Sequence, residues 1–304
     1  MIEATAEGRS DAVVGDEIGP PSPESDSLPS QPAHYRYNRT EIQAELANFT
    51  TQWKKQVEYL TEAAKQASLL QIDRQVHHRL QTWLRDLSPT NFWIQGPYDV
   101  SRPSQNSMTA VSLTALARTH NIPFVAYFCT FAAHDVLGMP KKADLGAFLA
   151  SVVTQLVQLI PERGYSRADL SPARFAALAQ GALKVGETLQ LVRDVRELGP
   201  RLVHVFIDNL QVLEDRSNQT YTRDFLSTIA ALCRLKGGNR LPESAGMPDT
   251  GELGFGTKIC FTTEGYVDGL AQAAELQLLY KVDFDQETTE TTSMEVGEGL
   301  EWGS

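Results

Sequence analysis

Short apolar runs alternate with longer amphipathic segments through the middle of the chain. Five of these runs are rich in β-branched and aromatic residues and have the length of buried strands. Segments with helical spacing separate them and begin near Ser104, Asp144, Ser171–Pro172 and Thr222. Strands that alternate with helices are typical of an α/β fold in which helices cover a parallel sheet. The predicted strands are Phe92–Gln95, Pro123–Cys129, Leu202–Ile207, Lys258–Thr263 and Leu278–Phe284.

The segment before the first strand, residues 35–89, has helical spacing from Asn38 to Leu87, with an interruption near Ala67. Apolar residues recur at intervals of three and four from Ile42 to Leu60 and again from Leu69 to Leu84, and Ser88–Pro89 ends the pattern. This periodicity predicts an α-helical hairpin that packs on its own domain. An intermolecular coiled coil is the alternative, which the short and interrupted repeat disfavours.

One long helix is predicted to begin at Ser171–Pro172, because serine is a good N-cap and proline suits the first turn. We expect it to end at Gly199–Pro200. The residues expected on its apolar face are Phe175, Leu178, Ala182, Val185, Leu189 and Val192. Residues 237–257 are rich in glycine and proline and predict an exposed loop.

Acidic residues gather at the two ends of the chain. The 304 residues carry a formal net charge of −11. Residues 1–34 hold seven acids against Arg9, and residues 284–304 hold six acids and no base, so the part between them is close to neutral. Residues 1–34 and 286–304 are also poor in large apolar residues, which predicts a disordered leader and a disordered tail. The near-neutral middle disfavours nucleic acid as a partner.

The cysteines and the hydropathy of the chain indicate the cellular compartment in which the protein is expected. Cys129, Cys233 and Cys260 are odd in number and widely spaced, which favours free thiols in a reducing environment. The acidic N-terminus lacks an apolar signal segment. The longest apolar run, Ile122–Ala133, is too short to span a bilayer. We therefore expect a soluble cytoplasmic protein without a membrane partner, with a nuclear location as the open alternative.

The stretch Phe92–Ser107, which reads FWIQGPYDVSRPSQNS, has the strand–glycine–helix layout of a phosphate-binding loop. Gly96 would end the strand. Ser104 and Ser107, with Asn106 between them, could cap the helix and leave backbone amides facing an anion. We take Gly96, Ser104, Asn106 and Ser107 as candidate nucleotide-binding residues. The alternative is that Ser104 is only a helix cap.

The lysine of a functional P-loop is missing from this stretch. The motif Gly-x4-Gly-Lys-Ser/Thr uses its lysine on the β- and γ-phosphates and its hydroxyl on magnesium. Counted from Gly96, the chain has Ser101, Arg102 and Pro103 at these positions. Arg102 is therefore a further candidate nucleotide-binding residue, although a guanidinium does not replace an ammonium group conservatively.

Two later strands end in polar side chains. The run LVHVFID ends at Asp208, and KICFTTEG places Thr262 and Thr263 at the end of another strand. The carboxyl ends of parallel strands meet at one edge of a sheet, so we expect these residues near Gly96. Asp208 could hold magnesium, and Thr262 and Thr263 could sense a phosphate. A helix-capping aspartate and purely structural threonines are the alternatives.

In this order the motifs FWIQGP, HVFIDNL and KICFTTEG resemble the NACHT-like branch of signalling P-loop NTPases, especially its degenerate fungal members. The resemblance covers residues 90–285. It implies a P-loop NTPase-like domain, with further acids at the third and fourth positions after Asp208 and a basic residue after the threonines. This chain has Gln211, Val212 and Glu264 there.

These departures together predict a pseudo-NTPase module in signalling or assembly, with no catalytic residue and no resident metal. ATP or ADP with magnesium would be its weakly held cofactor, and other proteins or a second copy of the chain its partners. A nucleotide-independent interaction scaffold is the main alternative. An active ATPase that uses Arg102 in place of lysine is the third.

Overall fold

The computed structural model describes residues 35–66, 71–86, 88, 90–98, 104–132, 144–235, 256–283 and 291–293. The described residues belong to one compact unit. The predicted leader lies outside this part of the chain, as do Arg102 and most of the loop at 237–257.

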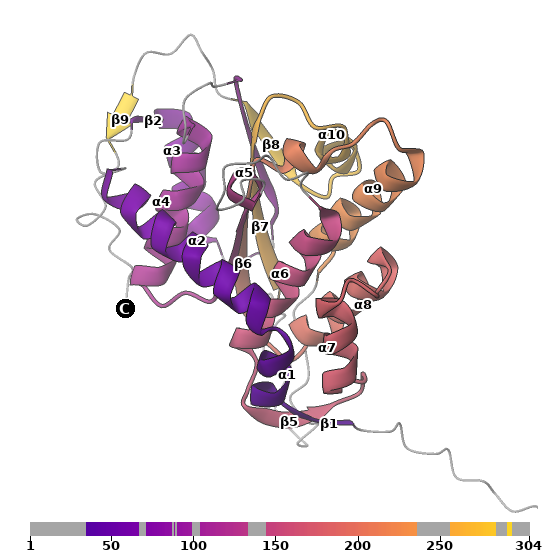
Figure 1. Cartoon of the computed structure of the whole chain (residues 1–304). Helices are drawn as coiled ribbons and strands as arrows, with labels where there is room; N and C mark the ends of the chain where they lie inside the picture. The colour runs from indigo at the N-terminus through magenta and orange to yellow at the C-terminus, as the bar shows by residue number, and fades with distance from the viewer. Residues whose placement is uncertain are drawn as a thin grey trace, which may run out of the picture. The chain divides into compact units, whose positions relative to one another are not determined.

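A five-stranded parallel sheet forms the centre of this unit, as the alternation of strands and helices predicts (Figure 1). The strands lie in the order β4-β6-β7-β3-β8, and every neighbouring pair is parallel. Their bounds are β3 Phe92–Gly96, β4 Phe124–Phe128, β6 Leu202–Asp208, β7 Gly256–Glu264 and β8 Tyr280–Asp283.

Successive side chains of these strands enter opposite cores, because the side-chain period of a strand is two residues. On one face, Trp93 and Phe261 pack with α6, α7, α8, α9 and α10. On the other face, Phe92 and Phe206 pack with α3 and α4. Figure 1 shows helices on both sides of the sheet. The bounds are α3 Arg74–Arg85, α4 Gln105–Thr119, α6 Leu145–Leu159, α7 Pro172–Ala179, α8 Val185–Arg196, α9 Gln219–Cys233 and α10 Asp268–Glu275.

The predicted helix at 171–199 is two helices, and the prediction of one continuous helix is wrong. α7 ends at Ala179 and α8 begins at Val185. Gly181 lies between them with φ +68°, a left-handed conformation that ends a helix and that glycine adopts without strain. Phe175 and Leu189 still reach the same core from the two separate helices.

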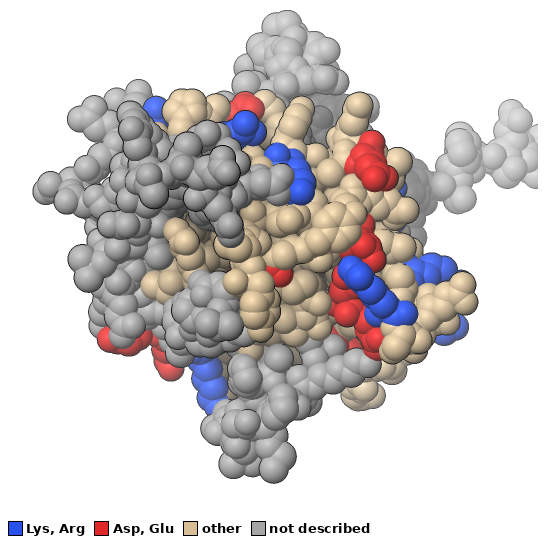
Figure 2. All heavy atoms as spheres, turned by 90° about the horizontal axis from the view of Figure 1, so that it is seen from above, with Lys and Arg blue, Asp and Glu red and all other residues tan. Residues whose placement is uncertain are grey.

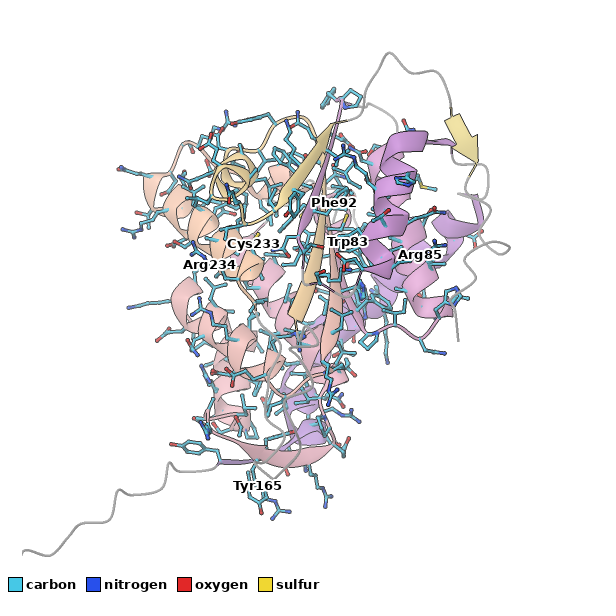
Figure 3. The ribbon with its side chains drawn as sticks, turned by 180° about the vertical axis from the view of Figure 1, so that it is seen from behind. Trp83, Arg85, Phe92, Tyr165, Cys233 and Arg234 are labelled. Atoms are coloured by element: carbon cyan, nitrogen blue, oxygen red, sulfur yellow. The ribbon has the colours of Figure 1, made fainter. Side chains whose placement is uncertain are left out.

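The segment before β3 contains two short strands besides the predicted helices: it comprises β1 Tyr35–Asn38, α1 Arg39–Glu45, α2 Ala47–Gln66, β2 Gln71–Asp73 and α3. α1 and α2 both contact α6, and α3 packs on the sheet. The indole of Trp83 in α3 lies 6.3 Å from the ring of Phe92 and donates a 2.8 Å hydrogen bond to the carbonyl of Thr90 (Figure 3). β2 pairs with β9 Thr291–Ser293, so a short strand forms within the segment predicted as a disordered tail.

A second two-stranded ribbon was not predicted from the sequence. β1 Tyr35–Asn38 pairs antiparallel with β5 Arg163–Ser166, which follows α6. Each strand has four residues, too few for a period-two pattern to stand out. Figure 1 shows this ribbon below the central sheet.

Short helices follow the ends of two central strands, with bounds α5 Cys129–Ala132 after β4 and η2 Leu210–Leu213 after β6. The three cysteines are free thiols, with Cys129 and Cys260 buried and Cys233 half-buried. Among the described residues, no helix is both long enough and apolar enough to cross a membrane.

Candidate functional site

The candidate site lies at the carboxyl edge of the sheet, where the chain leaves β3 and β7 in different directions. From β3 the chain continues into α4 and reaches the edge strand β4, whereas from β7 it continues into α10 and reaches β8. The two helices cover opposite faces. Such a divergence is the usual place for a ligand in an open α/β sheet. The backbone N–H of Gly265 donates a 2.8 Å hydrogen bond to the Gly96 carbonyl, which ties the two strand ends together.

The carboxylate of Asp208 is enclosed at this edge. Its side chain is fully buried at 0% exposure. Oδ1 accepts a 2.6 Å hydrogen bond from the Thr262 hydroxyl, and Oδ2 accepts from Ser107 Oγ at 2.7 Å and from Asn209 Nδ2 at 2.8 Å. Three predicted site residues, Asp208, Thr262 and Ser107, therefore meet in one hydrogen-bond network. The network also contains Asn209, which the sequence analysis did not identify. Asparagine is enriched in the left-handed conformation that Asn209 adopts here (φ 56°).

Burial raises the pKa of the Asp208 carboxyl from 3.8 to about 6, because the charged form loses its hydration. The hydrogen bonds from Thr262, Ser107 and Asn209 act in the opposite direction, and the nearby charge of Glu264 adds to the increase. All three donors satisfy the carboxylate from within the protein. An ionised carboxylate has about four acceptor sites, so these donors use most of the capacity of Asp208 to accept hydrogen bonds or to bind a metal.

Helix α4 begins later than a P-loop helix counted from Gly96. Ser104 is the N-cap, and its Oγ accepts a 3.2 Å hydrogen bond from the backbone N–H of Ser107. This confirms the predicted cap. The first helical residue is Gln105, so the first turn contains Gln105, Asn106 and Ser107. Arg102 precedes this turn and lies outside the described residues.

Asn106 occupies the space over Gly96. A Cβ atom on Gly96 would lie 2.3 Å from Asn106 Nδ2, and that nitrogen donates a 2.7 Å hydrogen bond to the Thr263 carbonyl. Asn106 is only 4% exposed. In a P-loop, glycine is used so that phosphate can approach the backbone closely. Here a side chain of the protein takes the position above the glycine.

Thr262 and Thr263 have different surroundings because neighbouring strand residues point to opposite faces. Thr262 belongs to the Asp208 network. The Thr263 hydroxyl accepts a 2.8 Å hydrogen bond from Trp93 Nε1 and donates one of 2.9 Å to the Gly265 carbonyl. Both hydrogen-bonding roles of Thr263 are thus used to position the end of β7.

The acids that follow Asp208 are engaged in structure. Glu214 Oε1 accepts a 2.9 Å hydrogen bond from the backbone N–H of Asp268 at the start of α10. Its other oxygen pairs with Arg216 at 3.0 Å, and Arg216 also pairs with Asp268 at 3.1 Å. Figure 2 views this edge of the molecule and shows acidic side chains gathered around basic ones on one side of it. Glu214 therefore holds a helix terminus.

No family model matches the chain, and no curated protein matches it. Across the described residues there is also no group of three or more histidine, cysteine, aspartate or glutamate side chains that could hold a metal ion.

Proposed function

We propose that the chain is a NACHT-like pseudo-NTPase module that acts in signalling or assembly and does not hydrolyse ATP. The P-loop-like assignment is supported by a parallel sheet in which the strand–glycine–helix element and the aspartate strand open on the same edge. The main observation that supports the loss of hydrolysis is the enclosure of the Asp208 carboxylate by Ser107, Thr262 and Asn209.

The residues present fit a magnesium-bound triphosphate poorly. Phosphoryl transfer depends on positive charge and positioned water around the transferred group. The Asp208 carboxylate that would hold the metal already accepts three hydrogen bonds from the protein, and Asn106 lies where a phosphate would approach Gly96. Gln211 and Val212 supply no acid to position water. Affinity for ATP or ADP is accordingly at most weak.

A hydrolysis assay tests the catalytic part of this proposal. The full chain is incubated with ATP and magnesium beside the Asp208→Ala variant. We expect phosphate release to be equally low in both. Steady release by the natural chain that disappears in Asp208→Ala would contradict the proposal.

A nucleotide-independent scaffold is the second candidate, and the contact of Asn106 with Gly96 and Thr263 favours it. Thermal unfolding with and without millimolar ADP or ATP separates the two, with a salt of matched ionic strength as the control. A ligand that binds only the folded state must raise the midpoint. A rise supports a nucleotide-responsive module, and an unchanged midpoint supports the scaffold.

A further inference from the structure

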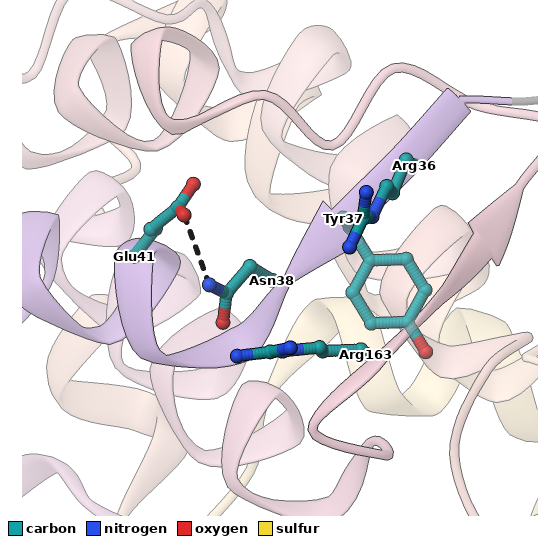
Figure 4. Close-up of a pocket in the computed structure, with 5 residues that line it drawn as sticks. All are labelled: Arg36, Tyr37, Asn38, Glu41 and Arg163. Atoms are coloured by element: carbon teal, nitrogen blue, oxygen red, sulfur yellow. Dashed lines mark hydrogen bonds between the residues drawn. The ribbon is translucent and has the colours of Figure 1, made fainter.

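A polar pocket of about 410 Å³ lies against the β1–β5 ribbon, away from the carboxyl edge of the sheet that carries Asp208. Its volume is within the range of small-ligand sites. The residues that line it are Arg36, Tyr37, Asn38, Glu41 and Arg163 (Figure 4).

The register of the ribbon places the two arginines on one face. Arg36 lies opposite Tyr165, and Asn38 lies opposite Arg163. Directly opposed residues of an antiparallel pair share a face, and residues two apart along a strand share it too. The other face carries Tyr37, which is buried and packs on Gly164, where a Cβ atom would lie 2.7 Å from the tyrosine oxygen. This close packing fixes which face of the ribbon is exposed.

The guanidinium groups of Arg36 and Arg163 form no salt bridge with a carboxylate of the described residues. Neither guanidinium group makes a hydrogen bond or a salt bridge within the described ranges, and Arg36 and Arg163 are both exposed; the charge of Arg163 contributes to lowering the pKa of the adjacent Glu162. The acids nearby are otherwise engaged: Glu41 accepts a 2.9 Å hydrogen bond from Asn38. Glu162 forms a 2.7 Å ion pair with Arg39.

Arg39, the first residue after β1, differs from these two arginines because its terminal nitrogens are engaged by the protein, although its Nε has no partner. It pairs with Glu162 and donates a 2.8 Å hydrogen bond to the carbonyl of Ile160. The pocket thus has two arginines and one acid on its walls, a positive excess in a chain whose net charge is −11. Guanidinium groups present a planar fork of donors that matches carboxylate and phosphate oxygens.

We propose that this pocket binds an oxyanion, a carboxylate or a phosphate group, carried by a side chain of an extended acidic peptide. Arg36 and Arg163 would hold the oxyanion by charge-assisted hydrogen bonds. Clusters of arginine are a recurring means of recognising acidic and phosphorylated motifs.

Two further observations favour a peptide over a free ion. Tyr165 is 70% exposed beside Arg36, and exposed tyrosine next to arginine is typical of the residues that dominate interfaces. Figure 3 shows Tyr165 projecting outward from the ribbon. Within the described part of the chain, β1 and β5 pair only with each other, so each has an edge that an extended peptide could follow.

Fluorescence anisotropy with the full chain at low salt tests the proposal. The probes are three labelled Gly/Thr peptides that differ only in one central residue: glutamate, phosphoserine or alanine. We expect the glutamate or the phosphoserine peptide to bind and the alanine peptide not to bind. The tighter of the two acidic peptides identifies the group as carboxylate or phosphate, and inorganic phosphate should compete if phosphate is preferred.

Arg36→Gln and Arg163→Gln should each weaken binding by about tenfold or more, the loss expected for one charge-assisted hydrogen bond. Arg167→Gln is the matched control, because Arg167 is exposed on the segment after β5 but does not line the pocket. Because all three arginines are exposed, we expect the thermal unfolding midpoints of the three variants to equal that of the natural chain. Equal binding of all three peptides, no binding of any, or equal weakening by Arg167→Gln would overturn the proposal.

Discussion

Asp208 and Thr262 lie opposite each other on adjacent parallel strands, and the Thr262 hydroxyl donates a 2.6 Å hydrogen bond to the Asp208 carboxylate. The same carboxylate accepts a hydrogen bond from Ser107 in the first turn of α4. One buried acid therefore connects two strands and a helix at the edge where a P-loop protein would hold its metal. Because the Asp208 carboxylate holds these elements together, we expect changes at this group to alter the free energy of unfolding.

The first prediction concerns pH. The pKa of Asp208 is about 6 in the folded chain against 3.8 as the ordinary value, so between these values the folded state binds the proton more tightly. Stability from this group is complete below about pH 4 and is lost as the pH rises through about 6, by at most about 3 kcal/mol. Denaturant unfolding from pH 4 to 7 measures this slope.

Asp208→Asn is the control for that slope, because asparagine has the same shape and does not titrate. The free energy of unfolding of the variant should change less between pH 4 and 6 than that of the natural chain. Groups with lowered pKa values, such as Asp86 and Glu162, are common to both proteins and cancel in the difference. Identical pH profiles would show that Asp208 does not titrate in this range.

The second prediction concerns the space over Gly96. Gly96→Ala would place a Cβ atom 2.3 Å from Asn106 Nδ2, so Asn106 must move and lose its hydrogen bond to the Thr263 carbonyl. We expect a loss of about 1–3 kcal/mol in the free energy of unfolding. Denaturant unfolding measures this loss.

A double-mutant cycle and a control glycine make that measurement specific. Adding Gly96→Ala to Asn106→Ala should cost less than adding it to the natural chain, because the clashing amide is gone. Gly186→Ala is the control: a Cβ atom there meets nothing within 4 Å, and the residue lies in α8. It should be neutral or slightly stabilising. Equal losses at both glycines would contradict the contact.

The central sheet and part of the site could be predicted because their signals are local. The apolar runs before Gly96 and Asp208 predict strands, and Ser104 predicts a helix start. Parallel strands share an edge, so the meeting of Ser107 with Asp208 across 101 positions follows from the pattern. The filling of the space over Gly96 by Asn106 depends on rotamers and close packing, which no periodicity encodes.

The helix break at Gly181 and the β1–β5 ribbon could not be predicted from the sequence for a second reason. The apolar spacing from Phe175 to Val192 continues across the break, since both helices use the same core, and only the backbone angle of Gly181 separates them. Arg36 and Arg163 are 127 positions apart in the numbering, and their shared face follows from the pairing of two four-residue strands. Strands that short give no periodic signal.

The third prediction concerns Arg196, which is fully buried at 0% exposure. Its guanidinium donates to Thr257 Oγ1 and to the carbonyls of Pro200, Arg201 and Gly256. Arg196→Lys cannot supply this fork of donors and should leave buried carbonyls unsatisfied, at a cost of about 3 kcal/mol or more.

Denaturant unfolding beside Arg193→Lys checks this cost. Arg193 is exposed on the same helix, and its substitution should change the free energy of unfolding by less than about 0.5 kcal/mol. Burial lowers the pKa of Arg196 to about 10, because the charged guanidinium loses its hydration. The hydrogen bonds to three carbonyls compensate for part of that loss. Similar small effects at both arginines would argue against that role.

The fourth prediction concerns Lys258, which joins α3 to the sheet. Its Nζ donates to the carbonyls of Trp83 and Asp86 near the end of α3 and lies 5.1 Å from the centroid of the Trp83 ring. Lys258→Met should cost about 1–3 kcal/mol and speed amide hydrogen exchange in α3 more than in α9. Lys281→Met is the control, because that lysine also lies 5.1 Å from an indole, Trp93, but is exposed on β8. Uniform acceleration of exchange across both helices would show that Lys258 stabilises the whole unit and does not fasten α3 specifically.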